Sequence, residues 1–509
     1  MYTAKVTQAL RAAGHDVLIL CQEPHAHRLA PVDAVGTVSA EGVSPLSDVL
    51  RSAGDRPALS RAAPTMPGPD LAPSGGGVLL RPDIGTLLPV FVYDEYEGFE
   101  VKRFVDLTDR ELADYLRLNV AALRAAAEWF EPDVVIAGHA VPGPVIARRA
   151  LGPGSYIAKV HGSDLEYAVR LQERYLDLAR EGLEGARAVV GGSADVLARA
   201  VELVPAVADR TRVVSPGVEV DLFRRAPRTD ALERLATLLE ADPDVIRGRP
   251  AALDDEVAKA ITLRDPDTLD ALALGYDQSA PDREVAVRIR RLAGGDRPLI
   301  GYLGKFIPQK GVDALLGALA TMGPEVHGLV VGFGLFREWL AALAFTLDRG
   351  DVDAARWVAN VSPLRVDLDD EEIRAAGGLA RRVTFTGRLD HRYAPAALAA
   401  LDILVVPSIL EEAFGMVAAE GASAGALPLV ARHSGLAEVA SALEARVDRP
   451  GVFSYQPGPG ASRHIATGIR RILSLPEQDR RDLRAAVSGF VAAEWTWVRT
   501  AERLLEAAG

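Results

Sequence analysis

The chain has 509 residues, of which 49% are hydrophobic and 25% charged, and its formal net charge is −13 at pH 7. This length exceeds what one hydrophobic core supports, so we expect two or three domains in a globular protein of ordinary composition. The negative net charge opposes non-specific nucleic-acid binding, which depends on neutralising phosphates, and we therefore expect no nucleic-acid partner.

The cysteine and hydropathy patterns indicate a protein of a reducing compartment. Cys21 is the single cysteine, so no intrachain disulfide can form. No apolar run reaches the ~20 residues of a membrane span. The N-terminal stretch has no apolar signal-peptide core. We expect a cytoplasmic protein, and these features leave open a peripheral contact with a membrane.

Apolar runs alternate with helical patterns along the chain. The N-terminal residues predict a helix already under way, because Val6, Leu10 and Ala13 share a face and Gly14 closes it. Nine strands are predicted, at 16–20, 133–138, 156–160, 188–192, 298–304, 327–334, 382–387, 402–408 and 427–432. Continuous apolar strands that alternate with helices in two blocks favour an α/β protein with two doubly wound parallel sheets.

Three stretches interrupt this alternation. Residues 34–76 are rich in Ser, Pro and Gly and predict a long loop. Residues 225–296 are charged and carry helical patterns between Pro-bearing turns, which predicts a helical insertion. Residues 345–376 predict a second, shorter one. We interpret both insertions mainly as surface elaborations.

Two carboxylates follow the strand 402–408. Open α/β sheets bind ligands beyond the carboxyl ends of their strands. Glu412 precedes Gly415 and a predicted helix that contains Glu420. The helix start suits a phosphate, the glycine allows close approach, and a carboxylate can accept hydrogen bonds from sugar hydroxyls. The alternative is that Glu412 caps the helix and Glu420 is a solvated surface residue.

Two lysines, Lys305 and Lys310, flank the turn after the strand 298–304. Two ammonium groups at such a turn can clamp a diphosphate, although solvated surface lysines are common. The turn lacks the glycine–lysine pattern of a P-loop.

Histidines follow two strands of the first half. His161 opens a His-Gly-Ser-Asp turn that ends at Asp164, and His139 follows the strand 133–138. A histidine at a strand end can hydrogen-bond a ligand, but a single histidine is more often structural. No metal-ligand spacing occurs in the sequence, so we expect neither a metal nor a cofactor.

Several segments together resemble the retaining GT-B glycosyltransferases of family 4. The segment 412–420 matches the E-x7-E motif of that family. Six further segments match in the expected order, at 12–20, 161–164, 214–223, 304–311, 382–389 and 494–505. The segment 425–438 also resembles bacterial glycogen synthases, which lack the second glutamate.

The resemblance implies a GT-B fold, with two Rossmann-like domains facing a cleft. Residues 1–213 would form the acceptor-side domain. Residues 214–484 would form the nucleotide-sugar-binding domain, which carries both insertions. Residues 485–509 would form a C-terminal helix that returns to the first domain.

The resemblance also implies an activity and a role for each site residue. A hexose would pass from a nucleotide-diphosphate sugar to a hydroxyl of a lipid, saccharide or small molecule. Glu412 would hold the transferred sugar, Glu420 the ribose, and His161 would lie near the anomeric carbon. Lys305 and Lys310 would neutralise the leaving diphosphate, so that no metal is required. The other donor-binding residues would be Gly304, Arg388, Phe414, Gly415, Met416, Ser434 and Gly435, with His139 and Asp164 on the acceptor side.

Two features depart from the family. Lys305 stands where the family most often has arginine, which keeps the charge but loses bidentate geometry. The family's first strand and its glycine-rich loop are missing before the first helix, so we expect the chain as written to be poorly stable or inactive. Two alternatives stay open: a glucan synthase-like enzyme on the same fold, and a catalytically degenerate sugar-binding relative.

Overall fold

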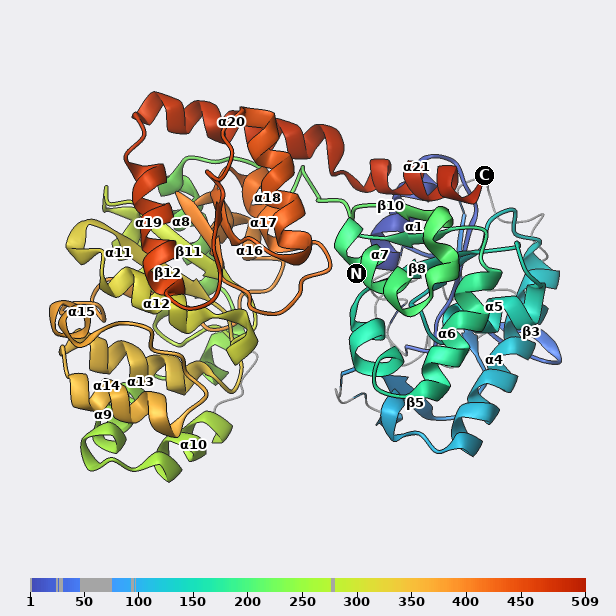
Figure 1. The fold of residues 1–509 in the computed structure, drawn as a ribbon, viewed down its shortest axis with the longest axis horizontal. Coiled ribbons are helices and arrows are strands. Elements are labelled where there is room, and N and C mark those ends of the chain that lie inside the picture. The colour runs from blue at the N-terminus through green and yellow to red at the C-terminus, as the bar shows by residue number, and fades with distance from the viewer. Residues whose placement is uncertain are drawn as a thin grey trace. The chain divides into compact units, whose positions relative to one another are not determined.

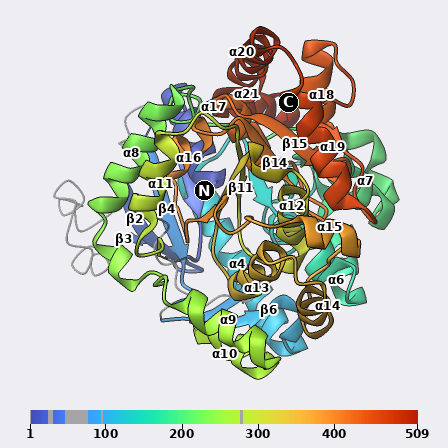
Figure 2. The same ribbon diagram turned by 90° about the vertical axis from the view of Figure 1, so that its left-hand side faces the viewer.

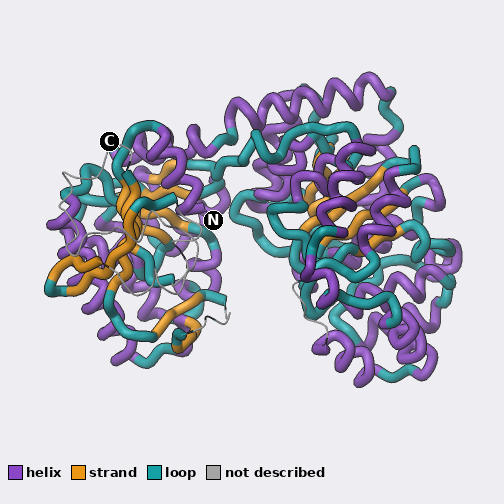
Figure 3. The backbone as a smooth tube through the Cα atoms, turned by 180° about the vertical axis from the view of Figure 1, so that it is seen from behind, coloured by secondary structure: helices purple, strands orange, loops and turns teal. Residues whose placement is uncertain are grey.

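The computed structural model describes residues 2–23, 26, 31–45, 76–92, 96, 98–275 and 280–509. The chain divides into two compact units, one of residues 1–217 with 497–509 and one of residues 218–496 (Figure 1). In both units the strands lie among helices (Figure 3). No helix of the described residues is long and apolar enough to cross a membrane.

The described strands of the first unit form two four-stranded sheets and a parallel pair. The first sheet has the order β1 (Val17–Leu20), β4 (Gly77–Pro82), β2 (Ala34–Ser39) and β3 (Gly42–Pro45), with β2 and β3 antiparallel and the other pairs parallel. The second is parallel, in the order β10 (Thr211–Val213), β9 (Val189–Gly191), β8 (Ile157–Val160) and β7 (Ile136–Gly138). The pair is β5 (Leu87–Val90) with β6 (Glu100–Arg103).

The helices of the first unit begin and end as their sequences indicate. They are α1 (Tyr2–Ala12), α4 (Asp109–Phe130), α5 (Gly143–Leu151), α6 (Glu173–Gly185), α7 (Ala194–Leu203) and α21 (Trp497–Ala508). A capping box starts α4, because the Thr108 hydroxyl accepts from the Glu111 amide while the Glu111 carboxylate accepts from the Thr108 amide. The Ser193 hydroxyl caps α7 in a similar way.

The prediction of a long loop over residues 34–76 is wrong for residues 34–45. These residues form the hairpin of β2 and β3, and β2 pairs with β4. Val35 and Val38 are buried, but the glycine and threonine between them hide the apolar pattern of the strand. The rest of the predicted loop, up to residue 75, lies outside the described residues.

The second unit is built on one parallel six-stranded sheet. Its order is β13 (Val383–Phe385), β12 (His327–Val331), β11 (Leu299–Leu303), β14 (Ile403–Val406), β15 (Leu427–Ala431) and β16 (Ser454–Tyr455). Numbered along the chain from β11, this is the doubly wound order 3-2-1-4-5-6, which reverses between β11 and β14. All nine predicted strands form, and the predicted α/β class with parallel sheets is confirmed. The doubly wound order itself is that of the second unit's sheet.

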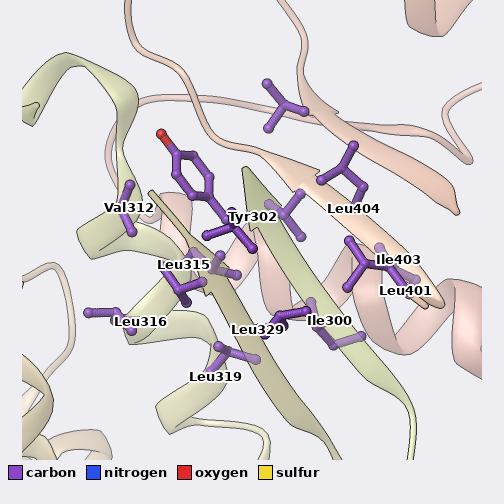
Figure 4. Packing of buried hydrophobic residues seen from close by; sticks show 14 of the residues in the cluster. Ile300, Tyr302, Val312, Leu315, Leu316, Leu319, Leu329, Leu401, Ile403 and Leu404 are labelled. Atoms are coloured by element: carbon purple, nitrogen blue, oxygen red, sulfur yellow. The ribbon is translucent and has the colours of Figure 1, made fainter. Parts of the chain in front are cut away.

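Helices lie on both sides of this sheet (Figure 2). The helices of the second unit are α8 (Arg228–Glu240), α9 (Leu253–Leu263), α10 (Pro266–Gly275), α11 (Val285–Ala293), α12 (Val312–Ala320), α13 (Arg337–Asp348), α14 (Val352–Val361), α15 (Asp370–Ala375), α16 (Ala394–Ala399), α17 (Met416–Ala424), α18 (Ser434–Val447), α19 (Ala461–Leu473) and α20 (Glu477–Glu494). Figure 4 shows Leu315 and Leu319 of α12 beside Leu329 of β12 and Ile300 of β11. Covering both faces explains why these strands are apolar throughout.

The two helical insertions are part of the core, which corrects their interpretation as surface elaborations. Leu235 of α8, Ile261 of α9 and Val358 of α14 are buried in the same cluster as the strands. A buried ion pair also fixes the first insertion, because the guanidinium of Arg249 donates two hydrogen bonds of 2.7 Å to the carboxylate of Glu338 on α13. Their side chains are 1% and 0% exposed.

We expect Glu338→Ala to lower the free energy of unfolding of the second unit by about 3–5 kcal/mol, because the Arg249 charge stays buried without its bidentate partner. Urea unfolding followed by tryptophan fluorescence measures the loss. The double variant Arg249→Met/Glu338→Leu is the control and should lose far less, since neither charge of this pair is then left buried without the other. A loss below about 1 kcal/mol in the single variant would contradict a structural role for the pair.

Candidate functional site

The reversal of strand order in the second unit brings two predicted site residues together. Lys310 follows β11 and Glu412 follows β14, and these two strands are neighbours in the sheet. The Lys310 ammonium donates to a Glu412 carboxylate oxygen, and the two side chains are 25% and 21% exposed. Loops at such a reversal point form the usual ligand crevice of an open α/β sheet. The pair is therefore placed where a ligand can reach both charges.

Hydrogen bonds from two neighbouring loops hold Glu412 in place. The Ser408 hydroxyl donates to the same Glu412 carboxylate oxygen at 2.8 Å. The Glu412 amide donates to the Ser434 hydroxyl at 3.0 Å, and the Gly435 amide donates to the Glu412 carbonyl at 3.0 Å. The alternative of a helix cap is wrong, because α17 has Gly415 as its N-cap residue and no side-chain cap.

Glycines allow these segments to approach one another closely. Gly311 has a φ of 64°, and a Cβ on it would lie 2.1 Å from the Pro407 carbonyl oxygen. A Cβ on Gly435 would lie 2.7 Å from the carbonyl oxygen of Glu412. A Cβ on Gly421 would lie 2.4 Å from Leu404. The small residues of α17 therefore let this helix pack directly on β14, which places its N-terminus beside Glu412.

Glu420 lies on α17 and is buried, so the alternative of a solvated surface residue is wrong. Its exposed fraction is 9%. Burial, and to a lesser degree the charge of Glu219, raises the pKa of Glu420 to about 8. Near neutral pH the protonated carboxyl can donate one hydrogen bond as well as accept others.

Two predicted cations gather over an aromatic ring that the sequence did not single out. The Lys305 ammonium lies 6.0 Å from the centroid of the Phe333 ring, and the Arg388 guanidinium lies 5.2 Å from it. Phe333 follows β12, between the loops after β11 and β13. Both cations are exposed, and the structure records no ion pair for either within the described part of the chain. The sequence could have indicated Phe333, because it is an aromatic residue in a Gly-Phe-Gly turn directly after a predicted strand.

The remaining donor-side predictions lie on the same loops. The Phe414 ring packs edge-on against Trp495 at 5.2 Å, which anchors the start of α17. Met416 is the first residue of α17. Gly304 directly follows β11, and a Cβ there would lie 2.6 Å from the Tyr302 hydroxyl oxygen. The structure thus places the predicted donor-side residues of the second unit on the loops and helices that directly follow β11, β13, β14 and β15.

The first unit carries a second group of predicted site residues. His139 follows β7 and His161 follows the neighbouring β8, and their ring centroids are 4.7 Å apart. The Asp164 carboxylate is fully buried and accepts from the Leu165 amide at 3.0 Å and from the Ala140 amide. It lies 3.7 Å from Nδ1 of His139. Asp164 therefore orders both histidine turns.

Three residues that the sequence reasoning missed surround these histidines. The Phe91 ring lies 4.7 Å from His139, and the Tyr2 ring lies 5.7 Å from His161. Lys159 is 3% exposed, and its ammonium lies 5.0 Å from the Tyr2 ring centroid. The sequence could have indicated Lys159, because it is a charged residue inside the apolar strand Ile-Ala-Lys-Val.

Burial lowers the pKa of the basic groups in this cluster, and His161 is lowered further by its neighbours. Burial lowers the pKa of Lys159 to about 8. Burial, with the charges of His139 and Lys159, lowers the pKa of His161 well below its ordinary value. His161 is therefore neutral near pH 7 and can donate one hydrogen bond and accept another.

Part of the second unit matches a known protein family, and the chain is similar to several known proteins. Residues 297–474 match the family described as Glycosyl transferases group 1. The chain is 28% identical over 217 residues to a glycogen synthase of Rhodospirillum rubrum, covering 43% of this chain and 38% of that protein. It is 28% identical over 268 residues to 2-deoxystreptamine glucosyltransferase of Streptomyces kanamyceticus, covering 52% and 55%. It is 35% identical over 169 residues to the GDP-mannose-dependent alpha-(1-6)-phosphatidylinositol dimannoside mannosyltransferase of Mycobacterium tuberculosis, covering 33% and 39%. The chain thus spans about half or less of the length of each relative.

Solved structures resemble the chain over more of its length. Sucrose-phosphate synthase from Thermosynechococcus elongatus is 18% identical, with a TM-score of 0.50 over 97% of this chain and 98% of that chain. Anabaena HepE in complex with UDP is also 18% identical, with a TM-score of 0.51 over 82% and 90%. At this identity the similarity concerns the fold alone, and the fold is that of GT-B glycosyltransferases.

We expect the stability of the free protein to fall between about pH 4.5 and pH 8 because of Glu420. In that range the unfolded chain has released the proton that folded Glu420 keeps, so each pH unit costs at most about 1.4 kcal/mol. Glutamine at position 420 has nearly the same shape as glutamate but cannot ionise. As the pH rises through this range, the melting temperature of Glu420→Gln should therefore fall less than that of the wild type. Thermal melts across this range test the expectation, and parallel curves for both proteins would contradict it.

Proposed function

We propose that the protein is a retaining glycosyltransferase of family 4. It transfers a hexose from a nucleotide-diphosphate sugar to a hydroxyl-bearing acceptor in the cytoplasm, without a metal or cofactor. The observation that carries this proposal is the Lys310–Glu412 pair at the point where the strand order reverses. Both residues lie within the segment that matches the glycosyltransferase family.

The donor diphosphate would be held by the cations beyond β11 and β13. Lys305, Lys310 and Arg388 can neutralise the charge that a leaving diphosphate gains in the transition state. Because Lys310 is paired with Glu412 in the free protein, a bound diphosphate would compete for its ammonium. Glu412 would then be free to accept hydrogen bonds from the hydroxyls of the transferred sugar.

The nucleoside would lie along the first turns of α17. Glu420 would hold the ribose, and the start of α17 at Gly415 would offer backbone amides to a phosphate. The buried, protonated carboxyl can donate to one ribose hydroxyl and accept from the other. HepE was solved with UDP, and the mycobacterial relative depends on GDP-mannose, so uridine and guanosine nucleotides are the first donors to test.

The acceptor would meet the first unit at His139 and Asp164, beside His161, whose expected place is near the anomeric carbon of the transferred sugar. Neutral imidazoles can accept a hydrogen bond from a hydroxyl and position it for attack. In a retaining transfer on the leaving-group side, the departing diphosphate would take the acceptor's proton. The mycobacterial relative is named for a phosphatidylinositol mannoside and the Streptomyces relative for 2-deoxystreptamine, which supports lipid, saccharide and small-molecule acceptors alike.

A second candidate is a glucan synthase-like transferase on the same fold. The similarity to the glycogen synthase of Rhodospirillum rubrum favours it. Both candidates share the donor chemistry and differ in the acceptor, which for this one would be a growing glucan chain. Incorporation of labelled glucose from a sugar-nucleotide donor into an α-glucan primer would distinguish the two candidates.

We expect Lys310→Ala and Glu412→Ala each to lower turnover by at least about 100-fold, as loss of a group that stabilises transition-state charge does. Release of free nucleotide diphosphate from a panel of sugar nucleotides measures turnover. Glu411→Ala, at the exposed neighbouring position, is the matched control and should stay near wild type. Turnover that survives in both site variants would contradict the proposal, and a folded wild type without turnover would favour a degenerate relative.

We expect one of UDP, GDP or ADP to raise the melting temperature, equally with Mg²⁺ and with a chelator, because a ligand that binds only the folded state stabilises it. Glu420→Ala should abolish the shift. A shift that requires Mg²⁺ would contradict the metal-independent mechanism. A shift that Glu420→Ala leaves unchanged would contradict the role of that residue.

A further inference from the structure

A pocket lies at the outer edge of the sheet in the second unit. Its volume is about 490 Å³, and it is lined by Arg432 after β15, by the loop and strand around β16, and by one face of α19. His464, Thr467 and Arg471 occupy that face at helical spacing. The proposed transfer reaction uses none of these residues.

The hydrogen bonds of β16 explain why Arg471 lies in this pocket. The carbonyl of Phe453 accepts from Val430 of β15 and that of Tyr455 from the next loop residue, Arg432. The carbonyls of Val452 and Ser454 therefore face the open edge of the sheet. Arg471 donates to both of these from one nitrogen, Nη2, at 3.3 and 3.1 Å. Among the described residues, no hydrogen bond is recorded for its other guanidinium nitrogens, which can therefore meet a ligand.

The charges of the pocket favour an anion. Arg432 is paired with the buried carboxylate of Glu444 at 3.0 Å, so these two charges largely cancel. The structure records no carboxylate partner for Arg471 among the residues it describes. The pocket therefore keeps one uncompensated guanidinium, a group well suited to phosphate.

Other groups in the pocket suit a ligand with hydroxyls. Nδ1 of His464 lies 2.7 Å from the Gln456 carbonyl and therefore carries its proton, which leaves Nε2 as an acceptor. The Thr467 hydroxyl and the Gln456 side-chain amide add both donors and acceptors at the wall. The volume is enough for a small molecule of sugar size.

We propose that this pocket binds a small, hydroxyl-bearing phosphate monoester, with Arg471 contacting the phosphate and His464, Thr467 and Gln456 contacting the hydroxyls. The pocket adjoins the candidate donor loop, because Arg432 lies two residues before Ser434. The inference does not rest on the proposed glycosyl transfer, since it concerns binding alone.

Isothermal titration calorimetry on the full chain tests it with three probes: a hexose 6-phosphate, inorganic phosphate and the unphosphorylated hexose. We expect the hexose phosphate to bind at least tenfold more tightly than phosphate, and the neutral hexose to give no heat. Arg471→Ala should weaken binding at least tenfold. Thr467→Glu places a carboxylate on the exposed face of α19 and should also weaken binding at least tenfold, because it repels the phosphate. This variant does not remove the Arg471 side chain that bonds to β16.

Arg470→Ala is the matched control, because Arg470 lies on the same helix but donates to the Thr321 carbonyl outside the pocket. Arg470→Ala should leave the affinity for the hexose 6-phosphate within twofold of that of the wild type. Lys310→Ala should also leave it unchanged, which separates this pocket from the candidate donor site. The proposal is overturned if no probe binds, if Thr467→Glu binds like wild type, or if Lys310→Ala abolishes binding.

Discussion

The reversal of strand order between β11 and β14 is the constraint on which the rest of the second unit depends. Helices that follow neighbouring strands diverge to opposite faces at this point, so the loops after the two strands border a shared crevice. Lys310 and Glu412 come from those loops and meet although they are 102 residues apart in the chain. Ser408 adds a hydrogen bond to the same carboxylate, so the pair is held from both strands.

Glycines let the segments around Glu412 approach one another closely. Gly311, Gly421 and Gly435 each lie where a Cβ would collide with a neighbouring segment. The run of small residues in α17 thus has a packing reason, since a larger side chain at Gly421 would push the helix away from Leu404. The same close packing buries Glu420, so the feature that positions the helix start also raises the pKa of that carboxyl.

The two units place basic groups in different electrostatic settings. In the second unit, Lys305 and Arg388 are exposed over Phe333 and remain open to an anion. In the first, Lys159 is buried and His161 is held neutral, which suits hydrogen bonding to an uncharged hydroxyl.

The helical insertions stabilise the second unit from within, because Arg249 and Glu338 tie the first insertion to α13.

The sequence by itself determined nine of the strands, because strands covered on both faces are apolar throughout. It therefore also identified Lys310, Glu412 and His161 as residues at strand ends. Only the tertiary structure decided that Glu420 is buried, that Phe333 lies under two cations, and that the insertions belong to the core. Burial and contacts across a hundred residues depend on which strands become neighbours, and local patterns of side chains do not encode that order. The hairpin of residues 34–45 escaped for the same reason, since its pairing with β4 compensates for a weak strand pattern.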